Sequence, residues 1–172
     1  MDLLSCLLPD STSLHPVSWH IDPHQATIAL TLISQQPAPE CPLCHRVAER
    51  LHSRYERPLA DLSWADWTIR LDLGVRKLFC DNSDCVRRIV TERLPGVVTP
   101  WARRTLRLGE RLTAIAVALG GSAGARLSQG LGMPVARNTL LRLIRAAPLP
   151  PCPTPAVLGV DDWAFRKGHT YV

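Results

Sequence analysis

The sequence predicts an α+β protein, with a β-rich N-terminal part and a helical part after Pro100. Hydrophobic and polar side chains alternate over residues 17–32 and again over 67–73, a period of two that is typical of strands with one buried face. After Pro100 the apolar period lengthens to about 3.6, which is typical of amphipathic helices. Two pairs of cysteines lie near the ends of the strand-like stretches, so we expect a metal ion to join them.

The first strands are expected to form a hairpin. Val17, Trp19 and Ile21 fall on one side of the first strand, and the run Ala26, Ile28, Leu30 and Leu32 shows the same alternation after a turn at Pro23-His24. Pro37-Ala38-Pro39 then ends the pattern. We therefore expect an N-terminal β-hairpin region over residues 1–36.

The cysteine spacing predicts a zinc ribbon over residues 37–97. A CxxC motif and a Cx4C motif, separated by a stretch with a strand-like middle, are formed by Cys41, Cys44, Cys80 and Cys85. Each motif offers two thiolates, and a sheet can bring both pairs around one Zn²⁺ ion in a closed, structural site. Two alternatives stay open: a redox dithiol at Cys41 and Cys44, with the other two thiols merely buried, or a histidine, His45 or His52, in place of one sulfur.

Composition and charge narrow the classes of function. The chain has 172 residues, 46% of them hydrophobic and 20% charged, as in a folded soluble protein. Without a signal peptide or a long apolar stretch, the cytoplasm is expected, where six cysteines favour metal binding over disulfides. Residues 86–147 hold eleven arginines and two glutamates, a balance of +9, which indicates a polyanionic partner. A merely solvated basic face is the alternative.

Three helices are expected between residues 98 and 147. The first is placed with Pro100 near its first turn and ends at Gly120-Gly121, and its apolar face consists of Leu108, Leu112, Ile115, Ala116 and Leu119. The second begins with Ser122 as N-cap and runs to about Gly130. After a tight connection, the third has one apolar face, with Leu140, Leu143, Ile144 and Ala147, and one polar face, with Asn138, Arg142 and Arg145.

This helical layout predicts a helix-turn-helix DNA-binding domain over residues 98–147. The start of a recognition helix meets base edges in the major groove, and Arg137 and Asn138 occupy that position. Arginine can form paired hydrogen bonds with guanine, and asparagine with adenine. The expected phosphate contacts, which position the protein without reading sequence, are Arg103, Arg104, Arg107, Arg142 and Arg145.

A proline-rich linker is expected over residues 148–156, and a new unit begins after it. Residues 157–162 form a strand-like run that ends at Asp161 and Asp162, and a turn and the start of a returning strand follow. A carboxylate at a strand end can hold one of two divalent ions in phosphoryl transfer, but such a site needs further carboxylates, and none follows Asp162.

Together these motifs resemble a family of bacterial insertion-sequence transposases, the ISL-three family of the DDE type. The resemblance covers nearly the whole chain beyond residue 35 and rests on Cys41-Pro42-Leu43-Cys44, His52 to Tyr55, Leu59 to Leu62, Val75 to Cys80, Cys85 to Arg88, Thr91 to Pro95, Ala102 to Thr105, Asn138 to Arg142 and Val157 to Tyr171. It implies that the four cysteines form the family's zinc finger, that residues 98–147 form its helix-turn-helix, and that residues 157–172 form the first hairpin of an RNase H-like catalytic domain. Asp161 then matches the first carboxylate of the catalytic triad.

Two departures from the family pattern shape the expected function. Val172 stands where the family has glycine, and the second aspartate and the glutamate of the triad are missing. We therefore expect a truncated transposase that is not an enzyme as the chain stands, with Mg²⁺ needed only by a full-length member. The expected partner is double-stranded DNA at the terminal inverted repeats of the transposon, with no membrane and no small-molecule substrate. A homodimer stays open, and the expected location is the bacterial cytoplasm, on the nucleoid when DNA is bound.

Rival functions come from two other classes. A stand-alone transcription regulator could consist of the same zinc ribbon and helix-turn-helix, and it would prefer a promoter to a transposon end. An active nuclease that depends on Asp161, or a thiol oxidoreductase that depends on Cys41, would be an enzyme.

Overall fold

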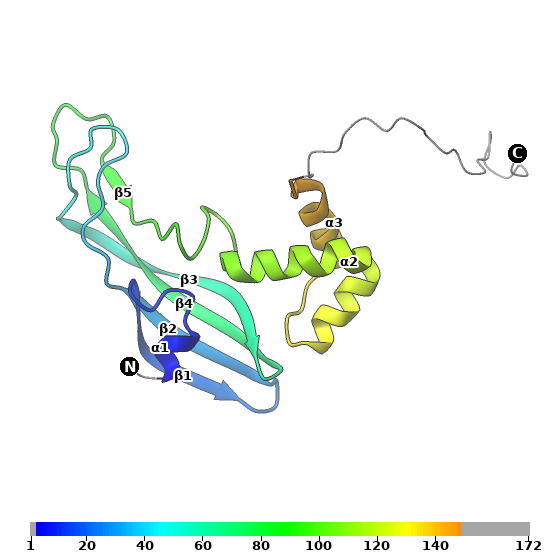
Figure 1. Ribbon diagram of the computed structural model, residues 1–172. Coiled ribbons are helices and arrows are strands. Elements are labelled where there is room, and N and C mark those ends of the chain that lie inside the picture. Colours follow the sequence, from blue (N-terminus) through cyan, green and yellow to red (C-terminus); the bar gives the residue numbers. More distant parts are fainter. Residues whose placement is uncertain (1–2, 149–172) are drawn as a thin grey trace, which may run out of the picture.

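The computed structural model describes residues 3–148 and shows the α+β class that the sequence predicts, with a mixed five-stranded sheet (Figure 1). The strands are β1 (Leu14–Asp22), β2 (Thr27–Ser34), β3 (Leu51–Trp64), β4 (Trp67–Phe79) and β5 (Ile89–Thr91). The helices are α1 (Leu3–Leu7), α2 (Leu106–Gly130) and α3 (Arg137–Ala146). The helical pair α2 and α3 lies to one side of the sheet, and the cysteine-bearing loops lie near β5.

The sheet combines two antiparallel hairpins in the strand order β1-β2-β4-β3. The expected N-terminal hairpin is confirmed, with a register from Leu14 opposite Ser34 to Asp22 opposite Thr27. The hairpins join through parallel pairing of β2 with β4, from Thr27 opposite Thr68 onward. Residues on both sides of the expected boundary at residue 36 therefore contribute to one sheet.

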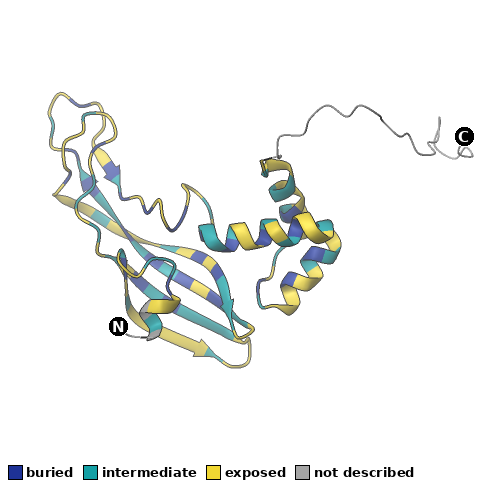
Figure 2. Cartoon of the chain, viewed as in Figure 1, coloured by how far each residue is buried: buried dark blue, intermediate teal, exposed yellow. Residues whose placement is uncertain are grey.

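One face of the sheet carries the core, as Figure 2 shows by its buried stripes. Period-two alternation along β2, β3 and β4 turns the largest apolar side chains to this face, where Leu30, Leu32, Leu59, Ile69, Leu71 and Leu73 are at most 1% exposed. Residues 94–98 and the N-terminal segment with Leu8 pack on this core. The edge strand β1 is different, because its Val17, Trp19 and Ile21 are exposed.

Helix α2 begins later than the sequence indicates. Its N-cap is Thr105, whose side chain accepts a hydrogen bond from the backbone N–H of Leu108, so Pro100 precedes the helix and is not in its first turn. At Gly120 the backbone leaves the helical region, with φ 71° and ψ −165°, a conformation open to glycine only. The expected break is thus present, and α2 consists of two helical segments that meet at this kink. The second segment follows Gly120 directly, so Ser122 lies inside its first turn and is not its N-cap.

Helix α3 packs against α2 and is tied to the sheet through the turn that precedes it. The shared core contains Leu108, Leu112, Ala116, Met133 and Leu140. The hydroxyl of Thr68 on β4 donates a hydrogen bond of 3.0 Å to the carbonyl oxygen of Gly132 in that turn. The position of α3 therefore depends on the end of the β3–β4 hairpin as well as on α2.

Candidate metal centre and basic helical face

Two loops at the same end of the sheet bring the four predicted cysteines together. The first loop is closed by an isolated bridge between Glu40 and Val47, and the second connects β4 with β5. All four sulfur atoms lie within 4.8 Å of one another. The Sγ atoms of Cys41 and Cys85 are 3.8 Å apart, and those of Cys44 and Cys80 are 3.5 Å apart. The four cysteines could therefore hold one metal ion.

These sulfur separations fit a tetrahedral ion. Four thiolates at about 2.3 Å from a central Zn²⁺ lie about 3.8 Å from one another, because the edge of a tetrahedron is about 1.6 times its centre-to-corner distance. The Cys41–Cys85 and Cys44–Cys80 separations differ from that value by at most 0.3 Å, and no two of the four sulfur atoms are more than 4.8 Å apart. A disulfide needs a sulfur separation of about 2.05 Å, and all four thiols are free in this structure.

Backbone amides already point at the sulfur atoms. Backbone N–H groups near the sulfur atoms act to lower the thiol pKa values: those of Cys44 and Leu43 for Cys41, and those of Arg46, Asn82 and Arg87 for Cys44, Cys80 and Cys85, respectively. The tight turns that make this geometry are closed by backbone hydrogen bonds, such as the one from the N–H of His45 to the carbonyl oxygen of Cys41, 2.9 Å. Such amide donors favour the thiolate, which is the form that binds a metal.

The surroundings of the cluster lower the pKa of some of the four thiols and raise that of others. The N–H of Arg46 lowers the pKa of Cys44 to about 6, against the opposing effect of burial. For Cys80 the N–H of Asn82 acts in the same direction, but burial and the neighbouring thiols together raise its pKa to about 12. The cysteine cluster packs against the buried side chains of Ala48, Leu78 and Val90, which shield it from water. A divalent cation suits this site because it stabilises several thiolates that otherwise repel one another.

The geometry does not favour either alternative interpretation of the cysteines, the redox dithiol or the histidine in place of one sulfur. A redox CxxC starts a helix, whereas the chain after Cys44 forms a turn in which His45 has a φ of 58°. His45 and His52 are exposed, and the ring of His52 packs edge-on against Phe79 at 4.8 Å. Among the described residues, the cluster consists of the four cysteines alone.

The polar face of α3 is exposed. Leu140 is fully buried against α2, whereas the expected DNA-reading and phosphate-binding residues of this helix, Arg137, Asn138, Arg142 and Arg145, are exposed. The side chain of Arg142 makes only long hydrogen bonds of 3.4 Å within the helix, to the carbonyl oxygen of Asn138 and the hydroxyl of Thr139. Its guanidinium therefore has donors available for a partner.

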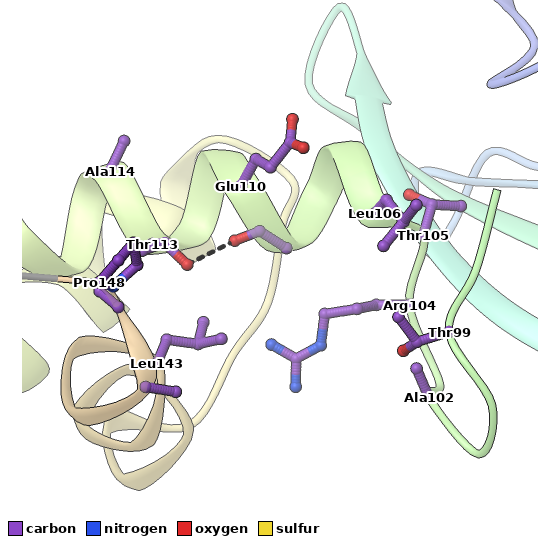
Figure 3. Close-up of a pocket in the computed structure, with 13 residues that line it drawn as sticks. Thr99, Ala102, Arg104, Thr105, Leu106, Glu110, Thr113, Ala114, Leu143 and Pro148 are labelled. Atoms are coloured by element: carbon purple, nitrogen blue, oxygen red, sulfur yellow. Dashed lines mark hydrogen bonds between the residues drawn. The ribbon is translucent and has the colours of Figure 1, made fainter. Parts of the chain in front are cut away.

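The three arginines around the start of α2 have different surroundings. Arg103 is exposed. Arg104 extends into a hollow of about 760 Å³ between α2, α3 and the preceding loop, and its Nη1 atom is buried without a hydrogen-bond partner (Figure 3). Burial, together with the nearby charge of Arg142, lowers the pKa of Arg104. The positive charges of Arg104 and Arg142 are thus near enough to influence each other.

Arg107 has a partner that the sequence did not indicate. Its Nε atom donates to Oδ1 of Asp61 at 2.9 Å, and its Nη2 atom bonds both Oδ2 of Asp61 and, at 2.7 Å, the carbonyl oxygen of Leu7. The Asp61 side chain is completely buried and also accepts a hydrogen bond from Thr105, 2.6 Å. Asp61 shares the inward face of β3 with Leu59, and a buried carboxylate needs a partner. The sequence gives no signal for this pair, because polar residues occupy most positions of β3.

Several expected features lie outside the described residues. Asp161 and the strand-like run around it are among them, and so is the linker over residues 148–156 except for Pro148. Cys6 lies on α1, away from the cluster of four cysteines. No helix in residues 3–148 combines the length and the hydropathy that crossing a membrane requires. No protein-family model, curated protein sequence or solved structure matches this chain.

Proposed function

We propose that this protein binds double-stranded DNA sequence-specifically, with α3 as the recognition helix of a helix-turn-helix. The observation that carries the proposal is the two-sided character of α3, which buries Leu140 against α2 and exposes Arg137 and Asn138 at its first turn. These two residue types can form paired hydrogen bonds with guanine and adenine, and the first turn of a recognition helix is the part that meets base edges.

The distribution of positive charge supports the same proposal. Arg142 and Arg145 follow on the exposed side of α3, and Arg104, just before the start of α2, is near enough to Arg142 for the two charges to interact. Guanidinium groups bind phosphate oxygens and so position a protein on a duplex without reading its sequence. Arg107 is left out of the interface, because Asp61 and a backbone carbonyl already take up its donors.

We further propose that the four-cysteine cluster binds one structural Zn²⁺ ion. Four sulfur ligands suit zinc and leave no open position for a reacting water molecule. The ion would fix the two loops next to β5, and its binding free energy would add to the stability of that end of the sheet. Metal analysis of the reduced protein should find one zinc per chain, and Cys80→Ser should lower that content. A reduced, folded protein without metal would refute this assignment.

The binding proposal has a direct test with a matched control. Selection from random duplexes should yield a defined site, and affinity for it should fall steeply with salt, by about 0.9 logarithmic units per phosphate contact and per tenfold rise in salt. Asn138→Ala should flatten the sequence preference, and Arg145→Ala should weaken binding to all duplexes. Arg70→Ala, which removes the same charge from an exposed site on β4, should leave binding unchanged. Equal effects of all three variants would overturn the proposal.

The family resemblance extends the proposal to a target, the terminal inverted repeats of a transposon, which the chain would bind as the front part of a transposase. A transcription regulator with the same two modules would prefer a promoter sequence. The selected site should therefore be compared with the repeats that flank the gene and with the promoters of its host. A site that occurs only in promoters would exclude the transposon target and leave DNA binding intact.

A further inference from the structure

A second surface combines aromatic rings with positive charge, beside β3 and the segment that leads to α2. A hollow of about 470 Å³ is lined by two aromatic residues, Tyr55 and Trp101, and by three arginines, Arg57, Arg93 and Arg103. No carboxylate lines this hollow. Of these residues, Arg103 alone is among the phosphate contacts expected for the helix-turn-helix.

The hollow follows from the register of β3 and from the segment that leads to α2. Tyr55 and Arg57 are two positions apart on β3 and therefore share one face. The segment with Arg103 runs beside β3, because the N–H of Ala60 donates to the carbonyl oxygen of Arg103 at 2.9 Å. Arg93 lies two residues after the short strand β5 and also lines the hollow.

The turn that contains Trp101 exposes the indole side chain of this residue. The backbone of Trp101 has a φ of 65°, which is costly for a bulky residue, and its side chain is 89% exposed. The Nη2 atom of Arg57 donates to the carbonyl oxygens of Thr99, at 2.9 Å, and Ala102, at 2.5 Å. Arg57 thus ties together both ends of the turn that presents the indole.

A flat, exposed indole beside guanidinium groups fits a planar base attached to phosphates. Aromatic side chains bind unpaired nucleotides by stacking on the base, and arginines beside them neutralise the strand. The faces of bases in a duplex are covered by their neighbours, so an indole can stack only on a base that has left the duplex. The hollow adjoins the one beside α2 and α3, because Ala102 lines both and Arg104, which lines the second, directly follows Arg103.

We propose that this hollow binds an unpaired nucleotide of a DNA strand, with the base on Trp101 and the neighbouring phosphates on Arg93 and Arg103. The inference rests on the proposed DNA binding in so far as the same DNA molecule would contact α3. Arg57 acts here as a positioning residue, since its donors hold the turn. Tyr55 forms the wall of the hollow on β3.

The test compares a blunt duplex that contains the selected site with the same duplex bearing a short single-stranded extension. For the unmodified protein, the extension should tighten binding by about tenfold and quench tryptophan fluorescence, since stacking contributes about 1–3 kcal/mol per base. Trp101→Ala should abolish this gain and the quenching while leaving affinity for the blunt duplex unchanged. Trp101→Phe should keep part of the gain, because a smaller ring still stacks.

The control is Trp19→Ala, which removes an indole that is 64% exposed on β1, and it should behave like the unmodified protein. An extension that adds no affinity, or equal behaviour of Trp101→Ala and Trp19→Ala, would overturn this inference. Failure of the proposed function looks different: the blunt duplex would not bind at all, while oligothymidine alone would still bind and quench. Tighter binding of oligouridine than of oligothymidine would overturn the assignment to DNA.

Discussion

Arg107 connects the first turn of α2 to the sheet, and its replacement tests whether this arginine holds the fold together or contacts DNA. In the structure its guanidinium bonds the buried carboxylate of Asp61, which is also held by Thr105, the N-cap residue of α2. Arg107→Met would leave the Asp61 carboxylate, which is 0% exposed, with the Thr105 hydroxyl as its remaining partner.

The burial of the Asp61 carboxylate determines how much free energy of unfolding is lost in Arg107→Met. Removing one partner of a buried ion pair typically costs about 3–5 kcal/mol, because the other charge stays buried and unpaired. The Arg107 side chain is 28% exposed, so water can partly replace it, and we expect the lower end, about 3 kcal/mol. With a urea m-value of about 2 kcal/mol per molar, the unfolding midpoint should fall by roughly 1.5 M. The double variant Asp61→Leu/Arg107→Met should recover more than half of the loss, since it leaves no buried charge.

Urea unfolding followed by circular dichroism in the presence of zinc measures this loss, and DNA affinity is measured in parallel below the transition. The matched control is Arg111→Met, the same substitution at an exposed position of α2, which should shift stability by no more than about 0.5 kcal/mol. If Arg107→Met keeps the urea midpoint of the unmodified protein and loses affinity for all duplexes, the arginine is a phosphate contact and our reasoning is refuted.

Three further predictions concern stability at other sites. Burial would raise the pKa of Glu92, but hydrogen bonds from Arg76 and Ser34 outweigh it and hold this pKa below its usual value. The carboxylate therefore stabilises the fold above about pH 4.5, and this contribution to the free energy of unfolding should disappear as the pH falls through the lowered pKa. Glu92→Gln should make the free energy of unfolding depend less on pH in the acid range. An unchanged acid slope in this variant would contradict the prediction. Leu140→Ala should cost about 2–5 kcal/mol and lower the melting temperature, because the side chain is fully buried between α2 and α3; a shift below 1 °C would disprove that packing. Gly132→Ala should lower the free energy of unfolding by roughly 2 kcal/mol or more, because φ is 69° and the added Cβ would lie 2.5 Å from a backbone oxygen. Gly109→Ala, with open space around it, should instead stabilise α2 by about 0.5–1 kcal/mol. Equal effects of the two variants would count against the described turn.

Local patterns account for much of the predicted fold. The alternation around Leu30 and Leu32 predicts the hairpin of β1 and β2, and the structure confirms it, because a strand with one buried face needs that period. Gly120 predicts a break in the helix, and a positive φ occurs there. The start of α2 at Leu106 could not be predicted, because the N-cap Thr105 is fixed by Asp61 on a distant strand.

For the candidate site, too, the sequence predicted some features and missed others. The spacing of the cysteines predicted which four side chains would meet, because each pair lies within one tight turn. Sequence alone treated Arg103, Arg104 and Arg107 as equivalent, whereas their surroundings in the fold are exposed, partly buried and ion-paired, respectively. The role of an arginine depends on which acceptors lie near it, and those acceptors come from other segments.

The sequence by itself determined the α+β class, the hairpin of β1 and β2, the four clustered cysteines and the two faces of α3, since periodicity and short spacings act between residues that are close along the chain. The tertiary structure alone decided the parallel pairing of β2 with β4, the partner of Arg107 and the outward turn at Trp101. Each of these depends on contacts between segments that are far apart in sequence, where hydrogen-bond geometry and burial select one arrangement among many with the same local pattern.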